Sequence, residues 1–410
     1  MCRKLPHIEF FSVVTCVVCV FFPNFVPWAL ANTYTVNDTA DYNFPPPDNR
    51  ICLRYAITLA NINPGSDTII LPAGTYVLSI STTKENNNVQ GDLDILDDLT
   101  ISGAGAEQTI VDGNSLDRVF DIYNDTMSIS GITIRNGKAP TGDSGGGGIR
   151  TSNGTLTLDK VIVSNNSVAA GGGVNDYGGG VGNNGVCTII NSTIANNQAY
   201  KGGGVSNNGS SIAVFMSTIS GNTDSVAAGG MLSISNTLVV NSTISGNSST
   251  SGAGGIYGFG ASTIISTTIT NNSSANGTDG YCNNTSGTLS VRNTIIAQNG
   301  DTNCCYSIGM TSNGYNLEDT NTCGFTKASD LINSDPKLAS LQNNGGPTFT
   351  HALQNGSPAI DAGTSVLLFP NDQRGKKRPC GPGYDIGAYE KCSGLLLFIP
   401  AIIGNSKSTQ

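Results

Sequence analysis

The sequence predicts an all-β fold, a right-handed parallel β-helix solenoid, and three observations support it. A phrase of the type Ser-Thr-Ile-Ser-Gly-Asn repeats with its isoleucine every 25 residues, at Ile194, Ile219, Ile244 and Ile269. A glycine followed by an apolar residue, as in Gly204-Val205, keeps the same period. The units are rich in Ile, Val, Thr and Ser, which favour strands over helices. A period of roughly 20–50 residues marks a repeat architecture, and one coil of three short strands and three turns has this length.

The repeated phrase predicts which side chains face the core and which form the bends. We expect one apolar residue per coil to stack along the axis, namely Val163, Ile194, Ile219, Ile244, Ile269 and Ile296. We expect one asparagine per coil to align at a bend, because amide side chains form ladders and asparagine tolerates the left-handed conformation: Asn166, Asn197, Asn222, Asn247, Asn272 and Asn299. The solenoid should cover residues 67–300 in about nine coils of about 25 residues; a propeller blade needs roughly 40.

The chain begins with features of a secretory signal peptide over residues 1–31. Arg3 and Lys4 precede an apolar run, and a small-x-small cleavage site ends at Ala31. An uncleaved membrane anchor is the alternative, but two prolines break the apolar run. The formal net charge of −9 over 410 residues argues against nucleic acid as a partner. We therefore expect a secreted or cell-surface protein.

The solenoid is expected to carry a cap at each end. Residues 32–66 form the N-terminal cap, in which 52–61 has the spacing of a short amphipathic helix. Residues 301–334 form a cysteine-containing transition segment, and 335–392 form a C-terminal cap domain. Residues 393–410 are an apolar tail, either a sorting signal or a final strand.

Three stretches resemble known families of exported proteins. Ile51-Cys-Leu-Arg-Tyr-Ala-Ile57, followed by Leu71-Pro-Ala-Gly-Thr-Tyr76, resembles the CSLREA domain at the start of secreted bacterial β-helix proteins. The coil phrases resemble the repeats of polymorphic outer-membrane proteins and pectin-lyase-like β-helices. Asn344-Gly-Gly-Pro-Thr-Phe-Thr-His-Ala-Leu353 and Tyr384-Asp-Ile-Gly-Ala-Tyr-Glu390 resemble the choice-of-anchor Q domain. These resemblances imply export and surface display, with the C-terminal region contacting the cell envelope and the outer membrane as one destination.

Two sets of residues are candidates for metal binding and for cross-linking. Four carboxylates lie close together in the sequence and suit Ca²⁺, although a solvent-facing strand with an acidic turn is the simpler interpretation: Asp92, Asp94, Asp97 and Asp98. No other cofactor is expected. An exported chain permits disulfides, and proximity favours Cys380 with Cys392. We interpret His351 as a structural hydrogen-bonding residue, and expect a charge network of Asp361, Asp372, Arg374 and Asp385.

Two functions remain open from the sequence. The first is a non-catalytic, adhesin-like or scaffold protein whose Ser/Thr/Asn-rich surface binds an extracellular glycan or a cell-surface protein. The second is a polysaccharide-active enzyme, a lyase or glycoside hydrolase of the pectin-lyase-like type. The catalytic candidates would be Asp143 and Asp176, which precede Gly-rich corners of neighbouring coils. The basic residues that a lyase needs, such as Arg150 and Lys201, occur singly between coils.

Overall fold

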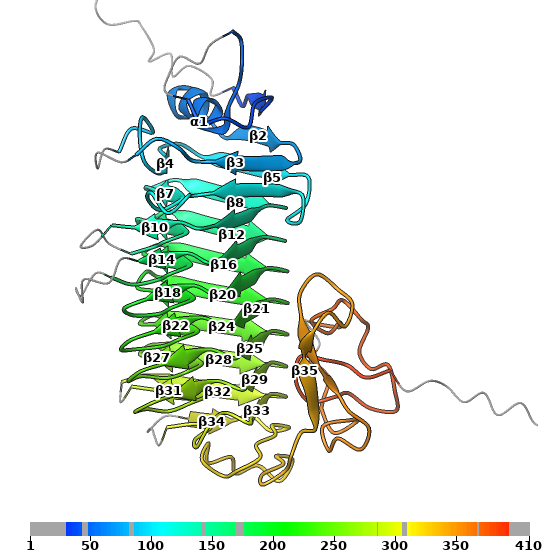
Figure 1. The fold of residues 1–410 in the computed structure, drawn as a ribbon. Helices are drawn as coiled ribbons and strands as arrows, with labels where there is room; N and C mark the ends of the chain where they lie inside the picture. The colour runs from blue at the N-terminus through cyan, green and yellow to red at the C-terminus, as the bar shows by residue number, and fades with distance from the viewer. Residues whose placement is uncertain are drawn as a thin grey trace, which may run out of the picture.

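The chain folds as a parallel β-helix in which successive coils stack strand on strand (Figure 1). The computed structural model describes residues 30–42, 48–81, 86–140, 145–168, 176–284, 286–305, 310–366 and 369–392. The signal peptide predicted over residues 1–31 therefore lies almost wholly outside the described residues, and the predicted tail 393–410 lies wholly outside them. Within the described part of the chain, no helix has the length and apolarity needed to cross a membrane.

Four parallel sheets run along the solenoid, and they contain 11, 9, 8 and 6 strands. The eleven-stranded sheet consists of β1 (Thr33–Thr35), β2 (Asp67–Leu71), β5 (Leu99–Gly103), β8 (Thr126–Ser130), β12 (Thr155–Asp159), β16 (Val186–Ile190), β20 (Ser211–Phe215), β24 (Asn236–Val240), β28 (Ala261–Ile265), β32 (Thr288–Arg292) and β34 (Met310–Ser312). The nine-stranded sheet consists of β3 (Gly74–Val77), β6 (Thr109–Asp112), β9 (Thr133–Arg135), β13 (Ile162–Ser164), β17 (Thr193–Ala195), β21 (Thr218–Ser220), β25 (Thr243–Ser245), β29 (Thr268–Thr270) and β33 (Ile295–Ala297).

The two remaining parallel sheets are built from shorter strands. The eight-stranded sheet consists of β4 (Leu93–Ile95), β7 (Phe120–Ile122), β11 (Ile149–Thr151), β15 (Val181–Asn183), β19 (Val205–Asn207), β23 (Met231–Ser233), β27 (Ile256–Gly258) and β31 (Tyr281–Asn283). The six-stranded sheet consists of β10 (Lys138–Ala139), β14 (Ser167–Val168), β18 (Gln198–Ala199), β22 (Thr223–Asp224), β26 (Ser248–Ser249) and β30 (Ser273–Ser274). The solenoid has about seven turns, slightly fewer than the nine predicted, because the outermost coils lack strands in some sheets.

The predicted apolar row lies in the core. Val163 pairs in register with Ile194, and the same register continues through the isoleucines one coil at a time to Ile296. All six side chains have 0% exposure and belong to one continuous hydrophobic cluster. The row follows from the strand period of two, which sends the middle residue of each Thr-Ile-Ser strand inward.

The asparagines form a buried ladder at the bend that follows the nine-stranded sheet. Each amide from Asn166 to Asn272 donates a hydrogen bond to the side-chain oxygen of the next asparagine at 2.9–3.0 Å. The left-handed conformation belongs to the residue before the ladder asparagine, a correction to the sequence-based expectation. Gly221 and Gly246 have φ values of 65° and 67° there, which explains the glycine in the Ser-Gly-Asn phrase.

Helix α1 (Leu53–Ile62) lies at the N-terminal end of the stack (Figure 1). It packs against β2 and β4 through an apolar side that includes Leu53 and Ile57. Arg54 is buried on the same helix and pairs with Asp41, with 2.7 Å between Nε and Oδ1. The helix therefore covers core side chains that no further coil would cover.

The segment 335–392 packs along the side of the solenoid (Figure 1). It contains β35 (Leu338–Gln342) and β36 (Thr350–Leu353), which pair antiparallel. Thr218 donates a hydrogen bond to the Phe349 carbonyl at 2.7 Å, Thr243 donates to Gln373 Oε1 at 2.6 Å, and Thr268 accepts one from the Ala388 amide at 3.1 Å. These threonines belong to β21, β25 and β29, so the segment contacts the outer face of the nine-stranded sheet.

Three disulfides lie in the C-terminal part of the chain. They join Cys282 to Cys305, Cys304 to Cys323, and Cys380 to Cys392. The first two fasten the last coils, and Cys304 and Cys323 belong to the main core cluster. Disulfides are typical of proteins that fold outside the cytosol.

Candidate functional site

The outer face of the eight-stranded sheet changes character along the solenoid. The first and third residues of its central strands, such as Val205 and Asn207, are buried toward the interior, so the middle residue points outward. The middle residues form one column in register, in this order: Asp94, Asp121, Arg150, Gly182, Ser206, Leu232, Tyr257 and Cys282. The column thus starts with charged residues and becomes apolar and aromatic.

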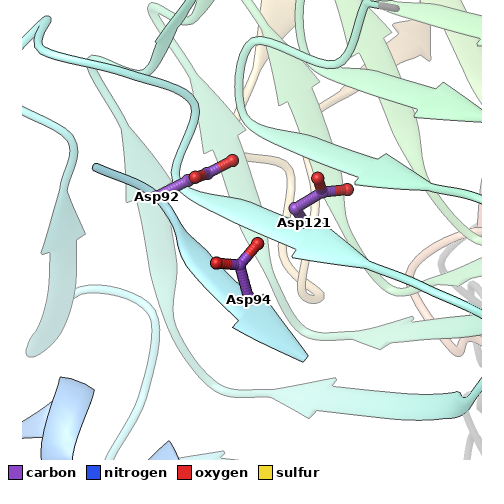
Figure 2. A group of neighbouring side chains, drawn as sticks. All are labelled: Asp92, Asp94 and Asp121. Atoms are coloured by element: carbon purple, nitrogen blue, oxygen red, sulfur yellow. The ribbon is translucent and has the colours of Figure 1, made fainter. Parts of the chain in front are cut away.

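A cluster of three carboxylates occupies the charged end of the column. Figure 2 shows Asp92, Asp94 and Asp121 grouped on neighbouring strands, and one oxygen of each lies within 4.8 Å of the others. Arg118 pairs with Asp92, with 2.7 Å between Nε and Oδ2. Arg150 Nε donates to Asp121 Oδ1 at 2.7 Å, and its Nη2 contacts the other oxygen. Two guanidinium groups thus compensate the buried negative charge.

Burial dominates the electrostatics of this cluster. It raises the pKa of Asp92 well above the usual range for a carboxyl; Arg118 opposes the shift, whereas Asp117, Asp94 and Asp121 add to it. Carboxylate oxygens at this spacing are ligands of the kind Ca²⁺ takes. All three carboxylates already have protein partners: Asp92 and Asp121 contact arginines, and Asp94 Oδ2 accepts a hydrogen bond from the Asn88 amide at 2.7 Å.

The four carboxylates predicted as a calcium site are divided between two places. Asp92 and Asp94 belong to the cluster, whereas Asp97 accepts a hydrogen bond from the Gly65 amide at 3.0 Å and Asp98 accepts one from the Thr126 amide at 2.7 Å. The third carboxylate of the cluster comes from the next coil and is Asp121, in place of Asp97 and Asp98. Only the register between β4 and β7 could have revealed it.

Only one member of the predicted catalytic pair lies within the described residues. Asp176 is buried with 0% exposure, and Asp143 lies outside the described residues. Asp224 accepts hydrogen bonds from the backbone amides of Val226, Ala227 and Ala228 at 2.6–3.2 Å. Burial raises its pKa. Asp224 therefore fixes a turn, as polar side chains commonly do.

A pocket of about 640 Å³ lies at the apolar part of the column. Its walls include the aromatic and polar residues Tyr177, Lys201, Asn208, Tyr257 and Phe259, together with the aliphatic residue Leu232. The rings of Tyr257 and Phe259 meet edge to face, with 4.9 Å between centroids. The Tyr177 hydroxyl is hydrogen-bonded to the Asn184 side chain at 3.2 Å, which holds its ring. No carboxylate is among the described residues that line this pocket.

Several turns position the pocket walls. The turn 226–228 that Asp224 fixes supplies Val226 and Ala227 to the wall. Leu232 and Tyr257 are neighbours in register on β23 and β27. The sequence does not reveal this pocket, because its members come from strands and turns of four successive coils. The change in the outward column from the small residue Ser206 to Leu232 and Tyr257 is the sequence feature that could have indicated the pocket.

A second polar constellation lies between the solenoid and the C-terminal segment. His351 Nδ1 contacts the Ala339 carbonyl at 2.6 Å, and His351 Nε2 lies 2.8 Å from Ser245 Oγ. Both side chains are buried, and burial lowers the pKa of His351. This geometry fits the structural role predicted for His351, since a buried imidazole with both nitrogens bonded holds two elements together.

In the predicted charge network of the C-terminal segment, Asp372 and Asp385 are buried, whereas Asp361 is exposed. Asp372 pairs with Arg374 at 2.7 Å, and Arg378 pairs with Glu390 at 3.1 Å. Asp385 accepts a hydrogen bond from the Asp361 amide at 2.8 Å, and burial raises the pKa of Asp385 to about 6. The network joins loops that have no regular secondary structure, so its role is structural.

Two of the solved structures that match this chain in comparison with known proteins are a pectate lyase and an epimerase module. A pectate lyase, Pel9A, is 16% identical, covers 88% of this chain and 96% of its own, and has a TM-score of 0.41. The A-module of the Azotobacter vinelandii mannuronan C-5 epimerase AlgE4 is 16% identical, covers 67% of this chain and 80% of its own, and has a TM-score of 0.36. No protein-family model matches the sequence, and no curated protein matches it.

Proposed function

We propose that this chain is an exported, surface-displayed β-helix that binds a glycan without turning it over. The observation that carries the proposal is the pocket of about 640 Å³ on the eight-stranded sheet, with three aromatic rings and no carboxylate among its described lining residues. The disulfides and the predicted signal peptide support export. The resemblance of the C-terminal segment to a surface-anchoring module supports display.

The pocket offers what a sugar ring requires. An aromatic face gives a broad apolar contact for the C–H face of a sugar, while polar groups at the edge fix the orientation of its hydroxyls. Tyr257 and Tyr177 supply rings, and Lys201 and Asn208 supply hydrogen-bonding groups. The walls stand on stacked strands, so little conformational entropy is lost when a ligand binds.

The alternative is a polysaccharide-active enzyme, and the cluster of Asp92, Asp94 and Asp121 beside Arg150 is the place that favours it. A lyase needs a base within reach of a proton next to a neutralised carboxylate. Arg150 is instead bound to Asp121 by two contacts, and Arg118 is bound to Asp92. Groups engaged in buried ion pairs are poorly placed to exchange protons with a substrate.

Binding to an immobilised panel of neutral and acidic glycans tests the proposal. We expect the purified chain to bind one glycan class, and Tyr257→Ala to weaken that binding by at least about tenfold, the equivalent of 1.4 kcal/mol. Phe349→Ala is the matched control, because its ring is 50% exposed and lies outside the pocket. Binding that is absent from the whole panel, or equal in Tyr257→Ala and the parent chain, contradicts the proposal.

A turnover assay separates the two functions. We expect no unsaturated ends and no new reducing ends from uronate polymers or neutral glycans, with or without Ca²⁺. Reproducible product that disappears in Asp121→Asn or Asp176→Asn would establish the enzyme and remove the non-catalytic proposal.

A further inference from the structure

A second hollow lies directly beside the pocket of about 640 Å³, hereafter the glycan pocket. It has a volume of about 410 Å³ and is lined by residues that include Lys138, Ser167, Gln198 and Tyr200. Lys138, Ser167 and Gln198 are neighbours in register at the outer edge of the six-stranded sheet. This hollow is therefore a separate site on the adjoining sheet.

The two hollows share one wall. Tyr200 lines the second hollow, and the next residue, Lys201, lines the glycan pocket. One coil further on, Ser225 lines the second hollow and Val226 lines the pocket. Consecutive residues are about 3.8 Å apart. The two hollows therefore meet at these two bends of the chain, residues 200–201 in one coil and 225–226 in the next.

The two hollows also have the same chemistry. Each combines a tyrosine with one lysine: Tyr257 with Lys201 in the pocket, and Tyr200 with Lys138 in the second hollow. Among the described residues, no carboxylate lines either hollow, and no ion pair involves Lys138 or Lys201. The chain as a whole carries a net charge of −9, so two hollows whose described lining residues include a lysine and no carboxylate are a local exception.

We propose that one linear acidic glycan binds across the shared wall and places an acidic sugar in each hollow. The inference rests on the proposed glycan binding and adds its length and its charge. Each lysine pairs with a carboxylate or sulfate of the ligand, and each tyrosine contacts a sugar face. A short glycan fills one hollow only. A longer glycan also occupies the second hollow. Its free end is then held at a high effective concentration near that hollow, because the two sites are rigidly joined.

A length series of carboxylated oligosaccharides, from the monosaccharide upward, tests this on the full-length purified chain by titration calorimetry. We expect the affinity to rise by at least about tenfold at one step in the series, where the ligand first spans both hollows. Tyr200→Ala should abolish that step and leave the affinity for the shortest ligands unchanged. Tyr200→Phe should retain the step, because it keeps the ring.

The same oligosaccharides with their carboxylates reduced to neutral alcohols test the charge. We expect them to bind more weakly, and Lys138→Gln to lower the affinity and the salt dependence of the long acidic ligands only. Lys327→Gln is the control, because this exposed lysine lies outside both hollows.

The outcomes separate this inference from the proposed function. Affinity that is independent of ligand length, or equal for acidic and reduced ligands, overturns the two-hollow inference and leaves single-pocket glycan binding intact. An absence of binding by every member of both series and of the wider glycan panel overturns both.

Discussion

The two ends of the outward column on the eight-stranded sheet occupy the same strand position in different coils. They differ in whether their side chains are available to a ligand. At the charged end, Asp121 and Arg150 bind each other through two contacts and are almost fully buried. At the aromatic end, Tyr257 is only partly buried and lines an open pocket. Stacking therefore makes the inward-facing residues of the solenoid alike from coil to coil, whereas the outward-facing residue differs independently in each coil.

The largest expected effect comes from the core beneath the aromatic end. Ile244→Asn should cost about 5 kcal/mol of unfolding free energy, because it removes buried methyl groups and buries an unpaired amide. In a one-dimensional solenoid the damage should stay near the mutated coil. Hydrogen exchange should therefore accelerate around β23 and β27 and stay unchanged around β4 and β7.

Ile244→Val is the matched control, with an expected cost of about 1 kcal/mol. Equal loosening of both ends of the column by Ile244→Asn would show that the coils unfold as one unit, and the comparison between the ends would lose its energetic basis.

The second expected effect is at the charged end. Arg118→Met should cost about 3 kcal/mol, at the lower end of the range for breaking a buried ion pair. The cost is moderated because Asp92, whose pKa is already raised by burial, can take up a proton. Adding Asp92→Asn should recover part of the loss, since no charge is then left unpaired. Denaturant unfolding measures both variants, and a double variant less stable than Arg118→Met would argue against the pairing.

The smallest expected effect concerns the turn that walls the pocket. Burial raises the pKa of Asp224 above its ordinary value of 3.8. A carboxyl with a raised folded-state pKa contributes stability below its unfolded pKa and loses that contribution as the pH rises through the folded value. Asp224→Asn does not ionise, so its Tm relative to the parent chain should increase as the pH rises above 3.8. Asp301→Asn, at an exposed carboxyl, should show no such trend.

The inward-facing half of the fold could be predicted from the sequence, and the outward-facing half could not. Ile194 and Asn197 repeat at a fixed spacing because every coil must fill the same core and turn the same bend. Asp121 lies 27 positions after Asp94, and only the strand register shows that they are neighbours. The pocket combines Tyr177 with Tyr257 across coils of unequal length, so no periodic pattern marks it.

The C-terminal segment shows the same limit. From the phrase alone, the threonine of Ser-Thr-Ile is one more residue of the Ser/Thr/Asn-rich surface. In three coils it is instead the contact for Phe349, Gln373 and Ala388. Sequence motifs suggested a C-terminal module, but its place on the side of the solenoid depends on side-chain matches more than 100 residues apart.

The lateral attachment of this segment determines how the protein carries mechanical force. A pull applied at Cys392 reaches the segment first, and the hydrogen bonds to Thr218, Thr243 and Thr268 pass it into three coils at once. We therefore expect the load to be shared among three coils and not to act on the last coil alone. That last coil is itself held by the disulfides Cys282–Cys305 and Cys304–Cys323. A tether at this end therefore pulls on the nine-stranded sheet in the middle of the rod, and not on the two sheets that bear the hollows.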